Sequence, residues 1–140
     1  MGRQAAGEIR SVSRYLLDTH ALLFWWGGSP RLSAPAVEAI ANPDAVILVS
    51  AASAWEIATK FRIGKLNDIG DPAEHFPALM QRDGFAPLPV SIAHGLRAGL
   101  LEGEHRDPFD RLIAAQGLME GATVITRDPE FAAFGCKVLW

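Results

Sequence analysis

The segment HRDPFDRLIAAQ, residues 105–116, predicts the beginning of a helix that carries acidic side chains in its first turn. Asp107 is a favourable N-cap residue, and Pro108 follows it at the first helical position, where proline is favoured. Apolar side chains then recur at helical spacing, at Phe109, Leu112 and Ile113. Because a helix N-terminus carries partial positive charge, it stabilises carboxylates, and this alone accounts for Asp107 and Asp110.

Strand and helix patterns alternate along the rest of the chain. Short apolar runs, typical of strands, lie at residues 15–17, 46–49, 85–90, 123–126 and 137–140. Helices are predicted to begin near Thr19, Ser33, Ser53, Asp71, Ser91, Asp107 and Asp128. Pro87 and Pro89 restrict the third strand to the edge of a sheet. The alternation predicts an α/β fold, a three-layer α/β/α sandwich with a short central parallel sheet.

Length, composition and charge narrow the class of protein. The chain has 140 residues, of which 49% are hydrophobic, and this predicts one compact domain over residues 15–140 after a flexible leader over residues 1–14. Its formal net charge is −3, whereas nucleic-acid-binding domains usually carry a basic face. A polyanionic substrate would therefore need local help from arginine, lysine or metal ions.

Cysteine content and hydropathy bear on the location of the protein. A single cysteine, Cys136, excludes a disulfide or a cysteine-based metal site within this chain, as is common in the reducing cytoplasm. The apolar runs are too short to span a bilayer, and residues 1–14 lack the apolar core of a signal peptide. We therefore expect a cytoplasmic protein that does not contact a membrane.

Four carboxylates occupy equivalent places along the chain. Asp18 directly follows the first strand, and Asp128 lies just beyond the fourth. Glu56 and Asp110 are predicted in the first turns of their helices. In a parallel sheet all strands end at one edge, and ligands bind in the crevice outside it. We therefore expect these four acids to meet in one pocket.

Each acid also has a structural explanation. Ser53 and Glu56 have the spacing of a capping box, and Asp128 before Pro129 is a favourable N-cap. Asp18 is the hardest to explain, because a carboxylate that ends a buried strand needs a partner. Four acids at one edge, with no lysine beside Asp18 or Glu56, would repel one another. A hard cation would relieve that repulsion, and an all-oxygen ligand set favours Mg²⁺ or Mn²⁺.

Other residues give weaker signals. The four histidines are scattered without metal-ligand spacing and are expected at surface or loop positions: His20, His75, His94 and His105. Ser50 and Ser53 lack a nearby histidine–acid pair that would indicate a nucleophile. The larger aromatic side chains are expected in the core or an interface: Phe24, Trp25, Trp26 and Trp55. No glycine-rich phosphate loop is present.

Four segments together resemble the PIN domain of VapC toxins in order and spacing. They are LLDTHALLFW (16–25), SAWEIATK (53–60), DPFDRLIAAQ (107–116) and VITRDPEF (124–131). The resemblance extends from about residue 15 to residue 140. It implies a PIN-like fold and a metal-dependent endoribonuclease, the toxin of a bacterial VapBC-type toxin–antitoxin pair.

The resemblance also implies roles for individual residues. The catalytic metal ligands of the family are matched by four acids: Asp18, Glu56, Asp110 and Asp128. Thr126 matches a hydroxyl of the family's site, and Asp107 is an alternative to Asp110. One or two Mg²⁺ or Mn²⁺ ions would activate water for hydrolysis of an RNA phosphodiester bond. Arg111 and Arg127 are candidate phosphate contacts, with ordinary surface salt bridges as the alternative.

The implied partners are an RNA substrate (a tRNA or another structured RNA), a cognate antitoxin and a second copy of the chain. Phe24, Trp25 and Trp26 are candidates for a groove that accepts a partner helix, although core packing competes with that role.

Other functions are compatible with acids at the edge of a parallel sheet. A phosphoacceptor signalling domain should carry a second acid beside the acceptor and a lysine after a late strand. Here Thr19 and His20 follow Asp18, and Arg127 follows the late strand. A haloacid-dehalogenase-type phosphatase needs Asp-x-Asp, which residues 18–20 do not provide. A non-catalytic binding module with the same fold remains open.

Overall fold

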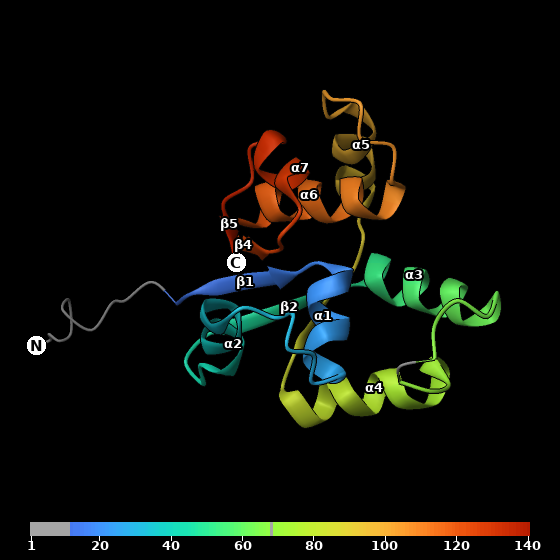
Figure 1. Cartoon of the computed structure of the whole chain (residues 1–140). Helices are drawn as coiled ribbons and strands as arrows, with labels where there is room; N and C mark the ends of the chain where they lie inside the picture. The colour runs from blue at the N-terminus through green and yellow to red at the C-terminus, as the bar shows by residue number, and fades with distance from the viewer. Residues whose placement is uncertain (1–11, 68) are drawn as a thin grey trace, which may run out of the picture.

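The computed structural model describes residues 12–67 and 69–140 (Figure 1). Within these residues five parallel strands form one sheet in the order β3-β2-β1-β4-β5. The strands are β1 (Arg14–Leu17), β2 (Val46–Ser50), β3 (Ala86–Leu88), β4 (Thr123–Ile125) and β5 (Val138–Leu139). The proline-containing strand β3 lies at an edge, as predicted. Most of the expected leader, residues 1–11, lies outside the described residues, and β1 begins at Arg14.

Helices cover both faces of the sheet. The described residues form α1 (Thr19–Trp26), α2 (Ala34–Ala41), α3 (Ala51–Arg62), α4 (Pro72–Asp83), α5 (Ile92–Leu100), α6 (Pro108–Glu120) and α7 (Pro129–Ala133). Figure 1 shows α5, α6 and α7 above the sheet and α1, α2 and α4 below it. The predicted three-layer α/β/α sandwich is confirmed.

The two hydrophobic cores follow from the alternation of side chains along the strands. Leu16 packs with Val124 and with α6 and α7 on one face, whereas Leu17 packs with Ile125 and with α1 and α2 on the other. Both leucines are fully buried. Successive side chains of a strand point to opposite faces, so a strand covered on both sides is apolar at every position. This is why the two residues before Asp18, Leu16 and Leu17, are both apolar although they face opposite sides of the sheet.

Capping side chains begin the helices where the sequence predicts them, with one exception. Five predicted caps accept a hydrogen bond from a backbone N–H of the first turn: Ser33, Asp71, Ser91, Asp107 and Asp128. The exception is α3, which Ser50 caps by accepting from the N–H of Ala52 at 3.0 Å. Strand β2 therefore passes into α3 without a loop, and the predicted capping role of Ser53 is wrong.

The parallel topology places the carboxyl ends of the strands side by side. Asp18 follows β1, and its backbone N–H donates to the carbonyl of Ile125, the last residue of β4. Thr126 follows β4, the strand that pairs with β1. Segments more than 100 residues apart in sequence thus meet at this edge. None of the helices in the described part of the chain is long and apolar enough to cross a membrane.

Candidate functional site

Asp18 is a buried carboxylate with two hydrogen-bonded oxygens. Its side chain is at the carboxyl end of β1, and the residue is 5% exposed. Oδ1 accepts from the N–H of Ala21 at 2.7 Å, so that Asp18 is also the N-cap of α1. Oδ2 accepts from the hydroxyl of Thr126 at 2.5 Å. This side chain therefore caps α1 and also lies at the candidate site.

Thr126 connects the acids that follow β1 and β4. Its hydroxyl donates to Asp18 and accepts from the N–H of Asp128 at 3.0 Å. The threonine is buried, with an exposed fraction of 2%. The sequence prediction that Asp18, Thr126 and Asp128 lie close together is consistent with this geometry.

Burial makes the negative charge of Asp18 costly. Desolvation raises the pKa of Asp18 from 3.8 to about 6, against the opposing effect of the hydrogen bonds from Thr126 and Ala21. The negative charge of Asp110 raises this pKa further, whereas His20 lowers it. The carboxylate is thus poorly stabilised by the protein alone.

Asp110, Asp128 and His105 form a group with the spacing of metal ligands. One ligand atom from each lies within 4.8 Å of the others. His105 Nε2 is 2.9 Å from Asp110 Oδ2. Burial raises the pKa of Asp110, the bond to His105 opposes this, and the charges of Asp107 and Glu56 raise it further.

His105 lies at the candidate site, and the sequence prediction did not place it there. We expected all four histidines at surface or loop positions, because none has metal-ligand spacing to another. The hydrogen bond to Asp110 raises the pKa of His105, burial opposes the shift, and the charges of Asp110, Asp128 and Glu130 add to it. A usable signal was its position two residues before the capping Asp107, since a loop entering a helix passes over the helix N-terminus.

His105 does lie in a loop, as expected, but the expectation of a surface or loop position is wrong for His94, which is buried in α5. It completes a capping box with Ser91, and its Nε2 lies 2.9 Å from Glu120 Oε2. This histidine therefore joins α5 to α6.

Glu56 is placed differently from the prediction in two respects. Because α3 begins at Ala51, Glu56 lies in the second helical turn rather than the first. Lys60 Nζ lies 2.8 Å from Glu56 Oε2, so the expectation of no lysine beside this acid is also wrong. Ser53 is not its capping partner, because the Ser53 hydroxyl lies 2.9 Å from that of Thr19.

The other oxygen of Glu56 fits a cation. Oε1 is buried and has no hydrogen-bond partner among the described residues. Such an atom costs free energy unless water or an ion contacts it. The charge of Glu56 also acts on Asp110, and that of Asp110 acts on Asp18. The charges of Glu56, Asp110 and Asp18 are therefore coupled, and one carboxylate oxygen of Asp110 lies within 4.8 Å of one of Asp128. A divalent cation would stabilise such a group of acids.

Asp107 is turned toward the backbone. Its Oδ1 accepts from the N–H groups of Phe109 at 2.9 Å and Asp110 at 3.2 Å. Asp110 caps nothing and points to His105 instead. The geometry therefore favours Asp110 over the alternative, Asp107, as the site residue of this helix.

The two candidate arginines differ in role. Arg111 donates to the backbone carbonyls of Ala98, Leu101 and His105 and lies 5.3 Å from the Phe134 ring centroid. These hydrogen bonds hold the loop before α6 in place. Because all three guanidinium nitrogens of Arg111 already donate to carbonyls, its predicted role as a phosphate contact is wrong. Arg127 is exposed at the rim of the site.

A cavity of about 310 Å³ opens beside the acids. Its lining residues are Asp18, His20, Arg127, Asp128, Pro129 and Trp140. This volume is at the lower end of the range for ligand pockets.

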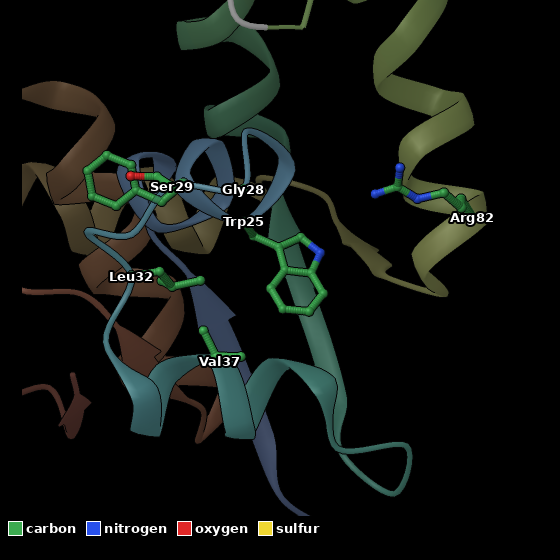
Figure 2. A pocket seen from close by; sticks show the side chains of 7 residues that line it. Trp25, Gly28, Ser29, Leu32, Val37 and Arg82 are labelled. Atoms are coloured by element: carbon green, nitrogen blue, oxygen red, sulfur yellow. The ribbon is translucent and has the colours of Figure 1, made fainter.

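A second cavity, of about 320 Å³, lies between α1, α2 and α4. Figure 2 shows Trp25, Leu32 and Val37 around it, with Arg82 reaching in from α4. Phe24 also lines it.

Of the four larger aromatic residues singled out in the sequence, Phe24, Trp25 and Trp26 are half-buried. Trp25 and Trp26 both donate to Asp83 Oδ2 and pack on the core. Trp55 is 62% exposed, which excludes a core position for it.

Comparison with known proteins identifies the family. The family described as "PIN domain" matches residues 15–135. Ribonuclease VapC16 of Mycobacterium tuberculosis is 45% identical over 69 residues, which are 46% of this chain and 49% of that protein. This chain thus spans about half the length of that relative. Ribonuclease VapC22 of the same organism is 30% identical over 125 residues, 84% of this chain and 88% of that protein.

Solved structures share the fold. VapBC2 from Rickettsia felis, bound to a promoter DNA fragment, superposes with a TM-score of 0.68 at 18% identity, over 90% of this chain and 97% of that one. A toxin–antitoxin complex from Klebsiella pneumoniae gives a TM-score of 0.57 at 16% identity, over 90% and 96%. With a family match over most of its length and a 30% identical relative over 84% of it, the chain belongs to the PIN domain family.

Proposed function

We propose that this protein is a metal-dependent endoribonuclease, the toxin of a VapBC-type pair. The observation that carries the proposal is the meeting of hydrogen-bonded carboxylates at the carboxyl ends of the strands, where Thr126 joins the buried Asp18 to the backbone of the half-buried Asp128. Both curated relatives described above are named ribonucleases.

The proposed metal ligands are Asp18, Glu56, Asp110 and Asp128, with Mg²⁺ or Mn²⁺ as the cation. Carboxylate oxygens favour these ions over Zn²⁺, although His105 adds one nitrogen at the edge of the set. A bound divalent ion supplies Lewis-acid stabilisation of the phosphoryl oxygens and lowers the pKa of water.

The chain's own residues hold this arrangement in place. Thr126 fixes the orientation of the Asp18 carboxylate, and Lys60 holds one oxygen of Glu56 while the other remains available. His105 holds one oxygen of Asp110. These contacts preorganise acids that would otherwise move apart by repulsion.

Cleavage of RNA tests the proposal. We expect cleavage in Mg²⁺ or Mn²⁺ and none in excess EDTA. Asp18→Asn should lower the rate by more than about 100-fold, since even residues that only support a ligand cost about 10- to 100-fold. Thr126→Val should fall within that smaller range. Lys137→Gln is the control, because Lys137 directly precedes β5 and therefore lies at the amino ends of the parallel strands, away from the acids.

Two outcomes would contradict this function. Undiminished cleavage in EDTA would contradict the metal mechanism. A purified protein that cleaves no RNA with either metal would favour the non-catalytic binding module.

We further propose a cognate antitoxin and a homodimer as partners. One solved neighbour is described as a toxin–antitoxin complex, which supports the first of these. Co-purification with the product of an adjacent gene, and loss of cleavage in the complex, test the antitoxin. Light scattering of the isolated chain tests the dimer. The cytoplasmic location and an RNA target such as tRNA stay predictions.

A further inference from the structure

A strip of cationic and aromatic side chains leads away from the acids. We call it the Phe24 strip, formed by Arg127, Phe24, Arg31 and Trp140. The guanidinium carbon of Arg127 lies 5.1 Å from the Phe24 ring centroid, and that of Arg31 lies 6.0 Å from it. The Trp140 ring centroid is 6.3 Å from that of Phe24. One ring thus contacts both cations and a second ring.

The two guanidinium groups are available to a ligand. Arg31 and Arg127 are both exposed, and neither forms an ion pair with an acid of the described residues. Arg111, by contrast, is committed to backbone carbonyls. Although Arg127 adjoins Asp128 in sequence, its side chain lies over Phe24. The aromatic contact orients a cation without neutralising it.

Residues of the strip line both cavities described above. Arg127 and Trp140 line the 310 Å³ cavity together with Asp18 and Asp128. Phe24 lines the 320 Å³ cavity between α1 and α2. A ligand whose reacting group lies at the acids can therefore continue over Phe24 toward Arg31 without leaving the surface.

We propose that the Phe24 strip binds the RNA strand next to the cleaved phosphate, with Arg127 and Arg31 on flanking phosphates and Trp140 beside a base. This inference rests on the proposed function. Guanidinium groups pair with phosphate oxygens through two parallel hydrogen bonds, and aromatic rings stack on unpaired bases. A chain of net charge −3 needs such a local set of cations to hold a polyanion beside four acids.

The strip positions the strand and takes no part in the chemical step. Loss of one of its arginines should therefore raise KM and leave kcat nearly unchanged, since the flanking phosphates are bound equally in ground and transition states. The acids differ, because their loss lowers kcat.

Binding of RNA to a cleavage-deficient protein tests the strip directly. The probe is a short, fluorescently labelled single-stranded RNA of mixed sequence, titrated into the Asp18→Asn protein with Mg²⁺ at several salt concentrations. Adding Arg127→Gln or Arg31→Gln should weaken binding of all sequences alike. Each should also lower the slope of log K against log salt by about 0.7, the value for one phosphate contact of a single strand.

A matched control removes one positive charge elsewhere. Adding Lys137→Gln to the Asp18→Asn protein should leave both the affinity and the salt slope unchanged, because Lys137 lies at the amino ends of the parallel strands. Phe24→Leu keeps an apolar side chain but removes the ring that orients both arginines. This variant should weaken RNA binding, but it should change the slope of log K against log salt by less than the value for one phosphate contact, because both arginines remain.

The outcomes separate the strip from the proposed function. Arginine variants indistinguishable from Lys137→Gln would overturn the strip, even if the protein cleaves RNA. The same holds if they bind RNA normally but lose a co-expressed antitoxin, which would make this face a protein interface. A lower kcat with unchanged KM would also overturn the positioning role. Lack of cleavage with intact, arginine-dependent RNA binding would overturn the nuclease function and keep the strip.

Discussion

Single residues at the carboxyl end of the strands combine a structural role with the role we propose for them at the site. Asp18 caps α1 through one oxygen and meets Thr126 through the other. Asp107 and Asp110 divide the same two tasks between them, because only Asp107 contacts the helix N–H groups. A substitution at one of these acids therefore changes stability in a direction that reports which task it performs.

Asp110→Asn separates the cap from the site. Burial and the charges of Asp107 and Glu56 raise the pKa of Asp110, so its carboxylate is disfavoured in the metal-free fold. We expect the variant to be at least as stable as wild type in EDTA at neutral pH. Asp107→Asn should lose roughly 0.3–1 kcal/mol, the charge–dipole contribution at a helix terminus. Denaturant unfolding of both variants measures the difference.

The same variants should respond differently to metal. Asp110→Asn should gain less stability from added Mn²⁺ than wild type, and Asp107→Asn should gain as much. Equal losses for Asp110→Asn with and without metal would assign this residue to the helix terminus.

The stability of the metal-free protein should depend on the ionisation of Asp18. Burial raises its pKa to about 6 in the fold, above the ordinary value of 3.8. The folded state therefore binds the proton more tightly, and this contribution to stability is complete below pH 4 and is lost as pH rises through 6. Two pKa units correspond to about 3 kcal/mol. Asp18→Asn, which has nothing to ionise, should lack this fall.

Urea unfolding of both proteins from pH 4 to 7, after metal removal, measures the difference between them. Other acids titrate in the same range, so the comparison uses the difference rather than either curve. Parallel curves would contradict the buried-carboxylate assignment.

At the scale of elements, a glycine allows α6, the helix that carries Asp110, to pack directly on the sheet. Its residues 113–117 are all buried, and Gly117 faces β4. A Cβ at Gly117 would lie 2.7 Å from Val124 Cγ2, closer than side chains tolerate. Glycine therefore allows α6 to lie directly on the sheet, and the same helix carries Asp110 at its first turn.

Gly117→Ala should destabilise the protein. The clash with the fully buried Val124 costs about 1–3 kcal/mol, which outweighs the gain of about 1 kcal/mol in helix propensity. Gly95→Ala in α5 is the control, because nothing lies within 4 Å of its Cβ. That variant should gain stability by the propensity effect. Thermal unfolding of both tests the close approach, and a stabilised Gly117→Ala would contradict it.

At the scale of the whole molecule, the strand order concentrates negative charge at one edge. The central strands β1 and β4 are neighbours, so the acids that follow them lie together. Helix α6 adds Asp110, and α3 adds Glu56. In the absence of a cation these acids repel one another, and the proposed divalent cation would relieve that repulsion.

A divalent cation should therefore stabilise the entire fold. Mn²⁺ at about 100 times its dissociation constant should raise the free energy of unfolding by about 2.7 kcal/mol. The double variant Asp18→Asn and Asp110→Asn should show little of this gain. Sodium chloride of equal ionic strength serves as the control. Equal melting temperatures of wild type in EDTA and in Mn²⁺ would show that the acids do not bind the ion.

The sequence by itself determined the layers of the fold and the places of most elements. Apolar runs without alternation predicted strands buried on both faces, and Asp-Pro pairs predicted the starts of α4, α6 and α7. These signals are local: a cap or a proline acts on the next turn of its own helix. Parallel strands end at a common edge of the sheet. The sequence therefore also predicted that acids that follow different strands approach one another.

Only the tertiary structure decided which atoms meet. The pairing of His105 with Asp110, the ion pair of Lys60 with Glu56 and the turn of Arg127 onto Phe24 depend on where neighbouring elements pack. The N-cap of α3 is Ser50 rather than Ser53, which moves Glu56 by almost one helical turn, and no local pattern distinguished the two serines. Side-chain direction is set by packing across elements, and a single sequence does not encode it in its spacing.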